Sequence, residues 1–390
     1  MNITTKSSNE LNKRYAIGNA AILLALFVLT FGCWNEYVWY EFMAPLGTLI
    51  SFVALVVAVF CYVPFKQMLR DKELYLVAIG SAVALVNLFI IHSNKGAFLT
   101  AADVLMMLYL WDKIIMSRRT LVITGVYLAF FYFYWTFDVK GYFKGYNTNY
   151  GGLVLITGFV YTMVMLTWLR RYFVTKNMNR VCKWIMVPTV FMFAWGYNII
   201  AWYRARCALI GLVVVLMLFF IPRRFFSIKW LYNCFCYIVA VGTIAISGVY
   251  ILLGRLKDIF TIQIFYKDIL SGRDAIWGEL WSEYLRHPIT GIGSSYTMKL
   301  AWMEGMFEVH NGFLDILIVH GAVVFIIAFV LLIKKLLWLR IYVAESETAK
   351  IAAVGVFALL VSSYMENFII VPPFLICFMI LPVFARCIQD

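Results

Sequence analysis

The sequence contains little charge, few histidines and few prolines. Charged residues make up 14% of the 390 positions, and there are 4 histidines and 8 prolines. This composition excludes an ordinary soluble globular domain, which carries far more charge on its surface. Hydrophobic residues instead reach 64%. We therefore expect lipid, rather than water, to be the solvent of most of this protein.

The chain also lacks the short motifs that mark several enzyme classes. There is no glycine-rich phosphate loop, dinucleotide fingerprint, Asp-x-Asp motif or His/Cys cluster with metal-ligand spacing. An enzyme that uses ATP or a nucleotide sugar in the cytoplasm is therefore disfavoured, and no metal or cofactor is expected. Of the 8 cysteines, Cys33 and Cys207 alone fall near the predicted outer face, which excludes a disulfide framework.

Apolar segments of about 20 residues recur along the whole chain, and this is the length that crosses a bilayer as a helix. We predict an all-α, polytopic integral membrane protein with about twelve transmembrane helices, forming a single domain over residues 1–390. The predicted spans are residues 16–33, 43–64, 73–92, 98–116, 120–137, 151–172, 184–202, 206–222, 231–254, 311–333, 349–366 and 368–386.

The charges between these spans predict the orientation. Most of the 33 Lys and Arg residues fall in alternate loops, and the positive-inside rule places those loops in the cytoplasm. Both termini are then predicted to be cytoplasmic. The net charge of +13 is accordingly a signal of topology, and no nucleic-acid partner is expected.

The longest polar interruption is a loop predicted on the outer side at residues 255–310. Ser271 and Asp274 have the Ser-x-x-Asp spacing of a helix N-cap. After them the apolar residues recur at helical spacing, with polar residues on the other face, and Pro288 ends the pattern. We predict an amphipathic helix that lies along the membrane interface or against the bundle. Its apolar stripe consists of Ile276, Trp277, Leu280, Trp281, Tyr284 and Leu285.

Three arginines are candidates for binding an anion. Arg273 falls in the first turn of that helix, where free N–H groups favour an anion, so a guanidinium there is suited to phosphate. Pairing of Arg273 with Asp274 or another nearby carboxylate is an equally good explanation. Arg204 and Arg206 stand at the outer entrance of a span, against the positive-inside bias. They bind an anionic ligand or extend towards lipid headgroups.

His310 is the strongest candidate among the histidines. It stands directly before the predicted span 311–333, followed by Asn311, and a histidine there can act as a base near neutral pH. Asp315 could orient it, and a hydrogen-bonded interfacial histidine is the alternative. His287 precedes a proline and His320 lies inside a span, so both are interpreted as structural.

The order of these motifs resembles that of the membrane O-antigen polymerase and ligase superfamily. The resemblance rests on SGR-x3-W, HP-x-x-GIG and HN-x9-G, which follow one another over residues 271–321. YNTNYGG at residues 146–152 is similar to an Asn-rich segment of that superfamily. YRARCALIG is similar to its Ser-Arg motif, with Ala205 where serine is usual. The resemblance covers roughly residues 146–370.

The resemblance implies a metal-independent, inverting glycosyltransferase in the bacterial inner membrane. The donor would be a polyprenyl-diphosphate oligosaccharide at the outer leaflet, and the other substrate a glycan acceptor. Arg206 and Arg273 would bind the diphosphate, and His310 would activate or position the acceptor hydroxyl. The additional residues assigned to substrate binding are Asn311, Glu366, Asp274, Arg204 and His287.

The acceptor distinguishes two activities within this superfamily. Ligases that attach glycan to lipid A core often have a His-[Asn/Ser/Gln]-x9-Gly-x-x-[Gly/Thr/Tyr] pattern, and Val324 departs from it at the last position. We therefore predict a polymerase of O-antigen or capsular repeat units, with a ligase as the alternative and a chain-length regulator as a possible partner. A polysaccharide flippase remains as an alternative of another class, although no internal repeat supports it.

Overall fold

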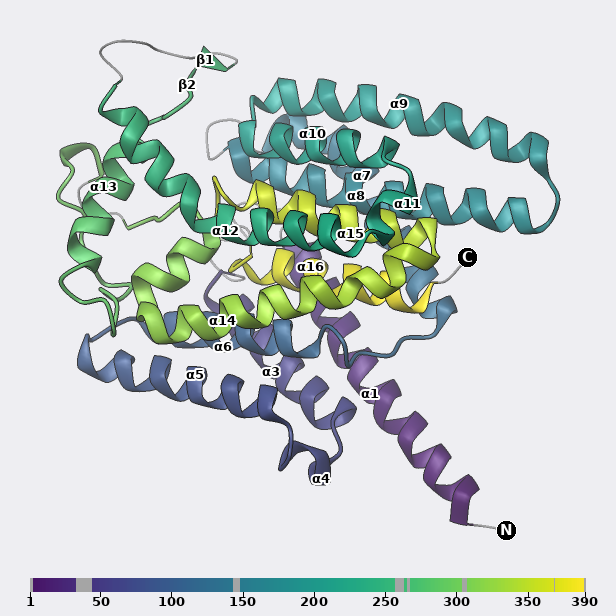
Figure 1. Cartoon of the computed structure of the whole chain (residues 1–390), viewed down its shortest axis with the longest axis horizontal. Coiled ribbons are helices and arrows are strands. Elements are labelled where there is room, and N and C mark those ends of the chain that lie inside the picture. Colours follow the sequence, from purple (N-terminus) through teal and green to yellow (C-terminus); the bar gives the residue numbers. More distant parts are fainter. Residues whose placement is uncertain are drawn as a thin grey trace.

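The structure is a computed structural model that describes residues 3–32, 44–142, 148–256, 263–264, 267–303, 307–367 and 369–388. Helices make up nearly all of it, arranged as one elongated bundle (Figure 1). The longer helices are α1 (Ile3–Gly32), α3 (Ala44–Tyr62), α5 (Lys72–Ile90), α6 (Lys95–Leu110), α7 (Arg118–Tyr142), α8 (Thr148–Thr175), α9 (Asn179–Tyr203), α10 (Arg206–Phe220), α12 (Lys229–Gly254), α14 (Gly312–Glu345), α15 (Glu347–Ser362) and α16 (Pro372–Cys387).

Each of the twelve predicted segments contains a helix, which confirms the all-α class. Among the described residues, six helices are long and apolar enough to cross a membrane: Asn12–Gly32, Lys72–Ile90, Gly151–Thr175, Arg180–Trp202, Lys229–Gly254 and Gly312–Glu345. Three further apolar helices are shorter, namely Leu46–Tyr62, Arg206–Phe220 and Pro372–Cys387. These features are those of a membrane protein, whereas the number of twelve spans stays a prediction.

The connections contain shorter elements. Helices α4 (Phe65–Met68) and α11 (Arg223–Ser227) follow α3 and α10, respectively. The loop between α12 and α14 contains a two-stranded antiparallel hairpin, β1 (Gln263–Ile264) and β2 (Lys267–Asp268), then α13 (Arg273–Tyr284) and the single turn η2 (Ala301–Met303). The predicted loop at 255–310 therefore contains its expected helix and, in addition, a hairpin that the sequence pattern did not indicate.

Side-chain caps fix where several helices begin. Asp71 accepts hydrogen bonds from the first turn of α5, Asn94 from that of α6 and Ser346 from that of α15. Asn311 does the same for α14, since its Oδ1 accepts from the backbone N–H of Leu314 at 3.0 Å. Each cap satisfies a backbone N–H that has no partner within its own helix.

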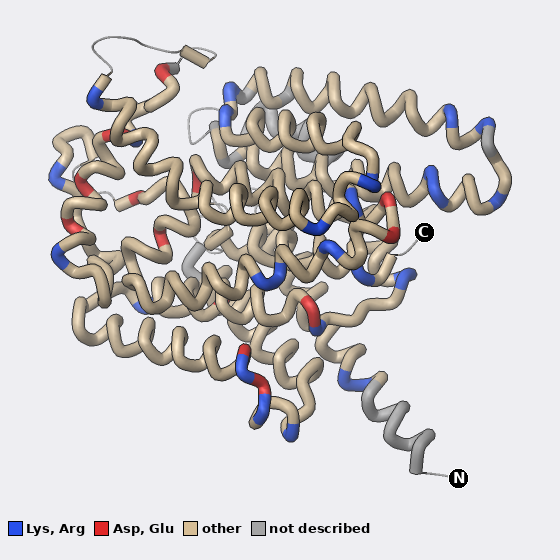
Figure 2. The backbone as a smooth tube through the Cα atoms, viewed as in Figure 1, with Lys and Arg blue, Asp and Glu red and all other residues tan. Residues whose placement is uncertain are grey.

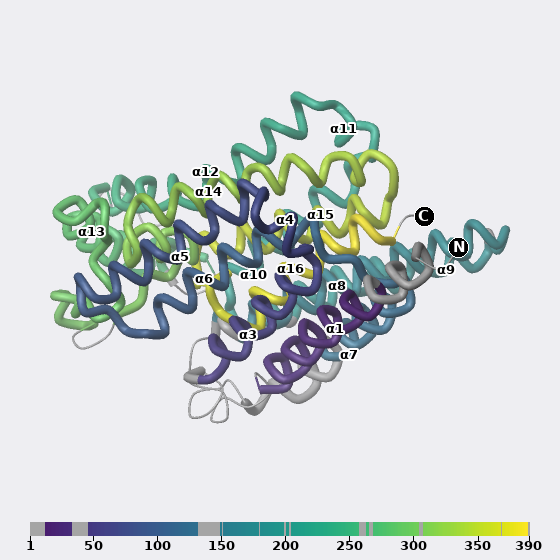
Figure 3. The backbone as a smooth tube through the Cα atoms, turned by 90° about the horizontal axis from the view of Figure 1, so that it is seen from below, coloured from purple at the N-terminus to yellow at the C-terminus, as the bar shows by residue number. Residues whose placement is uncertain are grey.

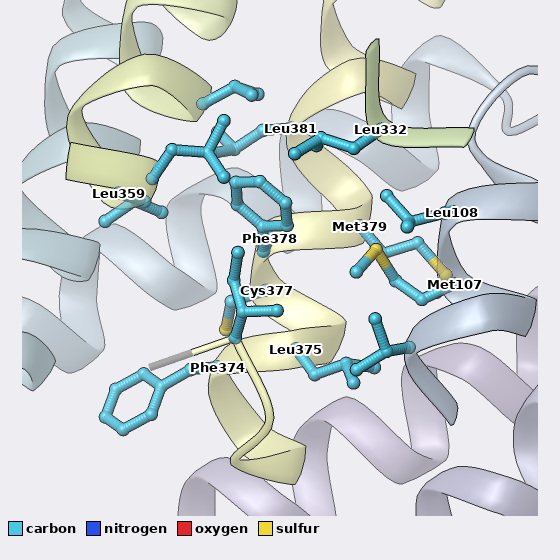
Figure 4. Close-up of a cluster of buried hydrophobic side chains, with 14 of the residues drawn as sticks. Met107, Leu108, Leu332, Leu359, Phe374, Leu375, Cys377, Phe378, Met379 and Leu381 are labelled. Carbon is cyan, nitrogen blue, oxygen red and sulfur yellow. The ribbon is translucent and has the colours of Figure 1, made fainter. Parts of the chain in front are cut away.

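Helix α16 forms the centre of the bundle. Every residue from Pro372 to Ala385 is buried, which is the pattern of a helix surrounded by other helices on all sides. Figure 4 shows Phe378, Met379 and Leu381 of α16 among side chains from α6, α14 and α15. The outer helices pack in neighbouring pairs, and α1 and α3 lie side by side in Figure 3.

The two ends of the bundle carry different elements. Figure 1 places α13 and the β1–β2 hairpin at one end, and the turn between α8 and α9 at the other. Figure 2 shows Lys and Arg on the α8–α9 turn, whereas both charge signs surround α13. The polar residues singled out from the sequence therefore gather at the end of the bundle that carries α13.

Candidate functional site

Helix α13 is held against the bundle by its apolar stripe. Ile276, Trp277, Leu280 and Tyr284 are buried, and α13 packs mainly against α12. The indole N–H of Trp277 donates to the carbonyl oxygen of Val309 at 2.7 Å. Of the two predicted placements, contact with the bundle is the observed one. Leu285, by contrast, is 69% exposed, because the helix has already ended at Tyr284.

The predicted N-cap of α13 is wrong. The cap residue is Gly272, whose φ of 77° suits a glycine, and no side chain caps this helix. Ser271 is engaged elsewhere, because its Oγ accepts a hydrogen bond from the guanidinium of Arg206 and donates to the carbonyl of Asp268. Arg206 also donates to the carbonyl oxygens of Asp268 and Ile269. These bonds fasten the start of α10 to the start of α13.

Arg273 is the first residue of α13 and forms a buried ion pair with Glu366. Its Nη2 lies 2.7 Å from Glu366 Oε1 and also donates to the carbonyl oxygen of Met365 at 2.7 Å. The two side chains are 8% and 4% exposed, so both charges are shielded from water. The carboxylate that pairs with Arg273 is therefore that of Glu366 and not that of the adjacent Asp274.

Glu366 connects the arginine to the histidine. The predicted span 349–366 extends too far, because α15 ends at Ser362 and Glu366 lies in the connection that follows. Besides Arg273, it accepts a hydrogen bond from the Asn149 amide at 2.6 Å, and its Oε2 lies 3.5 Å from His310 Nδ1. Burial alone would raise the pKa of Glu366, but the hydrogen bond from His310 and the charge of Arg273 lower it.

His310 lies between two carboxylates at the start of α14. Its Nδ1 is 3.2 Å from Glu308 Oε1 and 3.5 Å from Glu366 Oε2. Burial alone would lower the pKa of His310, but the hydrogen bonds and charges of Glu308 and Glu366 raise it to about 9. The imidazole is therefore protonated at neutral pH. Asp315, the carboxylate expected to orient it, is not among these partners.

A cavity of about 280 Å³ opens beside these residues. Arg206 and Arg273 both line it, together with Asn149 and Tyr250. The rest of its wall is mainly apolar and comes from α10, α12 and the β1–β2 segment: Ile210, Ile246, Val249, Leu253, Ile264 and Ile269. The Nε of Arg273 is buried and has no hydrogen-bond partner in the described part of the chain. The cavity thus combines two guanidinium groups with a long apolar wall.

A metal ion is an alternative use of the carboxylates. Ligand atoms of Glu308, His310 and Glu366 lie within 4.8 Å of one another, close enough to share one cation. However, Glu366 already forms an ion pair with the guanidinium of Arg273, and the positive charge of that guanidinium repels a second cation. Metal binding would also require His310 to lose its proton. The residues therefore fit a protonated histidine held by two acids better than a metal site.

The four remaining residues that were assigned to substrate binding range from fully buried to exposed, and they lie outside the lining of the cavity. Asn311 is fully buried, caps α14 and donates to the carbonyl oxygens of Thr243 and Tyr364, so its contacts are structural. Asp274 is half-buried on α13. Arg204 and His287 are exposed. None of these four is among the residues that line the cavity, whereas Arg206 and Arg273 are.

Two residues of the site were not assigned a specific role from the sequence. Asn149 bonds to Glu366, and its only signal was its position within the Asn-rich segment. Glu308 contacts His310 from two positions earlier in the chain, and its proximity in sequence could have indicated this contact. Cys207 is buried with its Sγ near the carbonyl oxygen of Asn149, and Cys33 lies outside the described residues.

One comparison with known proteins finds a similarity to a family over part of the chain. Residues 148–329, slightly less than half of the chain, match the model of the family described as O-antigen ligase. This segment is O-antigen-ligase-like. It begins at the helix that carries Asn149 and ends in α14, so it contains Arg206, Arg273 and His310. The predicted resemblance to the O-antigen polymerase and ligase superfamily is confirmed. No curated protein and no solved structure matches the chain.

The family match connects the geometry to a class of chemistry. A match to the O-antigen ligase family points to a membrane glycosyltransferase-like enzyme that acts on lipid-linked glycans. The segment that matches does not include Glu366, which is the partner of both Arg273 and His310. The O-antigen-ligase-like segment therefore completes its polar site with a residue from the connection between α15 and α16.

Proposed function

We propose that this protein polymerises polyprenyl-diphosphate-linked oligosaccharide repeat units by metal-independent, inverting glycosyl transfer at the outer leaflet of the bacterial inner membrane. The observation that carries the proposal is the cavity in which two guanidinium groups meet an apolar wall. A lipid diphosphate has the matching chemistry, because its two phosphates are anionic and its prenyl chain is apolar.

In this proposal the donor enters between α10 and α12. Arg206 and Arg273 bind the diphosphate, with the buried Nε of Arg273 providing a donor that has no hydrogen-bond partner among the described residues. The first prenyl units lie along the apolar wall formed by residues such as Ile246 and Leu253. The two guanidinium groups are already in place to stabilise the negative charge that develops on the departing diphosphate, which lowers the activation barrier of glycosyl transfer.

On the acceptor side, His310 is a positioning group. Its Nδ1 faces the two carboxylates, which leaves Nε2–H to donate a hydrogen bond to the acceptor hydroxyl oxygen. Since the pKa of His310 is about 9, the imidazolium does not take up the hydroxyl proton at neutral pH. The hydroxyl oxygen attacks the anomeric carbon, the bond from that carbon to the phosphate oxygen breaks, and lipid diphosphate leaves. The hydroxyl proton passes to Glu308 or to water.

A ligase is the second candidate, and the description of the matching family favours it. The two activities share donor binding and bond formation and differ in the acceptor. A ligase would transfer the glycan to lipid A core, whereas a polymerase would transfer it to a second repeat unit. The departure at Val324 from the ligase pattern supports the polymerase.

The test is a transfer assay with purified protein and a polyprenyl-diphosphate repeat unit, analysed for product length. We expect a ladder of products, unaffected by a chelator. Replacing Arg206 by Ala should lower kcat/KM by about 10²-fold or more, because a charged donor to the leaving group is lost. The control is Arg286→Ala, an exposed arginine of the predicted outer loop that does not line the cavity, and this variant should change the rate less than about twofold.

The other outcomes identify the alternatives. If lipid A core is added as the acceptor and becomes labelled with glycan while no ladder of polymer products forms, the protein is a ligase. Transport of the repeat unit across a liposome without a new glycosidic bond would make it a flippase. A full ladder from the Arg206→Ala variant would refute the assignment of the donor site.

A further inference from the structure

A second polar cavity, of about 330 Å³, lies between α8, α9, α10 and α15. Arg170, Arg171 and Lys350 contribute cations to its lining, and Glu347 is the one acidic residue among the described residues that line it. The lining therefore carries two more positive than negative charges. The remaining residues are mainly apolar and include Phe219 and Phe220.

This cavity lies at the opposite ends of helices that also carry the polar site. Asn149 is near the start of α8 and Arg206 is the start of α10, whereas the second cavity is lined by Arg170 late in α8 and Phe220 at the end of α10. Helix α10 has 15 residues, which at 1.5 Å per residue separates the two regions by roughly 22 Å. The second cavity is accordingly distinct from the site described above.

The charge at this cavity is built into the fold. Lys350 is 4% exposed, and its Nζ contacts the carbonyl oxygens of Phe219 and Ile221 at 3.2 and 3.1 Å and Glu347 at 3.0 Å. These contacts hold the ammonium group in one place. Arg170, in contrast, is exposed at the rim. One fixed cation and one accessible cation thus belong to the same cavity.

The surroundings indicate which anion would enter. Phe220 is 67% exposed, and Val187 and Val190 of α9 are 58% and 63% exposed, so apolar surface continues outward from the polar lining. A phosphate group with an attached acyl chain matches both parts. The positive-inside rule assigns this end of the bundle, with the basic α8–α9 turn in Figure 2, to the cytoplasmic leaflet.

We propose that the cavity formed by Arg170, Arg171, Glu347 and Lys350 binds the phosphate headgroup of an anionic phospholipid from the inner leaflet. The headgroup phosphate lies against the cations, and the acyl chains follow the exposed apolar face of α9 and α10. This role is separate from glycosyl transfer and makes no use of the residues of the polar site.

The experiment measures lipid binding to the purified full chain by native mass spectrometry. The probes are phosphatidylglycerol and, as the uncharged comparison, phosphatidylcholine. Arg170→Gln combined with Arg171→Gln should weaken phosphatidylglycerol binding by roughly 30-fold and leave phosphatidylcholine binding unchanged. The matched control is Lys66→Gln with Arg70→Gln, two exposed cations near α4 on the same predicted side, which should retain wild-type binding.

Two results would overturn the proposal. One is equal phosphatidylglycerol affinity in the wild type and the Arg170/Arg171 variant. The other is displacement of the lipid by an excess of inorganic phosphate, which would assign the cavity to a soluble anion. If the double variant does not fold, Arg170→Gln alone at its exposed position gives the same comparison, with melting temperature as the check on folding.

Discussion

Arg273 and Glu366 lie 93 positions apart in the sequence and form an ion pair of 2.7 Å in which both side chains are buried. The same carboxylate also lies 3.5 Å from His310. The proposed donor side and the proposed acceptor side are therefore joined by one side chain. Any change at Glu366 alters both sides together.

The first prediction concerns the stability that this carboxylate provides. Glu366→Gln keeps the shape of the side chain but leaves the buried charge of Arg273 without its counter-ion. We expect the variant to be less stable by about 3–5 kcal/mol, as for other buried pairs that lose one partner. Thermal unfolding in detergent measures the difference.

The control for Glu366 is Glu308→Gln. Glu308 contacts the same histidine, but its side chain is 43% exposed, so we expect a loss below about 1 kcal/mol. Equal losses for the two variants would contradict the assignment of Glu366 as the buried partner of both cations.

The second prediction is a pH dependence of stability caused by His310. Its pKa is raised from the ordinary 6.5 to about 9 in the folded protein. The stability that comes from this shift is fully present below pH 6.5 and is lost as the pH rises through about 9. The melting temperature of the wild type should therefore fall over this interval more than that of His310→Gln.

The same pKa predicts the pH profile of transfer. A protonated positioning group gives a rate that is flat from pH 6.5 to 8 and declines as the imidazolium is lost near pH 9. A rate that instead rises through pH 9 would identify His310 as the base and contradict its positioning role.

The third prediction concerns the docking of α13. Trp277→Phe removes the indole N–H and leaves the buried carbonyl oxygen of Val309 without its partner, which should cost about 1–3 kcal/mol. Because Val309 directly precedes His310, we also expect kcat to fall about tenfold or more through misplacement of the histidine. Unfolding and single-turnover kinetics measure the two effects.

Trp281→Phe is the matched control for Trp277. Trp281 lies on the same helix, and its indole N–H donates to Ser247 of α12 at 2.9 Å rather than to the segment that carries His310. Its loss should lower stability and leave kcat within about twofold of wild type. A similar kcat for both variants would show that the contact to Val309 does not position His310.

The sequence predicted the helical class and brought out the residues around which the polar site forms. Arg206, Arg273 and His310 were each marked by a local pattern: a cation at an outer span entrance, a cation at a helix start, and a histidine before a span. Local patterns of this kind survive folding because they depend on neighbouring residues in the chain.

The parts that the sequence did not predict depend on contacts between distant segments. The Ser-x-x-Asp pattern indicated a cap at Ser271, but Arg206, 65 positions earlier, takes the Ser271 hydroxyl instead. Likewise, Asp315 was expected to orient His310, whereas the carboxylates that contact it are Glu308, two positions earlier, and Glu366, beyond α15. In both cases the local contact that spacing suggested does not form, and a distant segment provides the partner of Ser271 and one of the two partners of His310.

Helix α14 deviates from helical geometry at Gly321, where φ is 82° and ψ is 176°. A Cβ there would collide with the carbonyl oxygen of Ile289, so glycine is needed at this position. Between Ala322 and Lys334, the first charge after this break, the helix spans roughly 18 Å at 1.5 Å per residue, less than the hydrocarbon thickness of a bilayer. The predicted span 311–333 therefore needs the segment Gly312–His320 to cross the membrane, and the break at Gly321 falls inside that span. His310 then stands directly before the outer end of the predicted span, where the proposed acceptor side meets water.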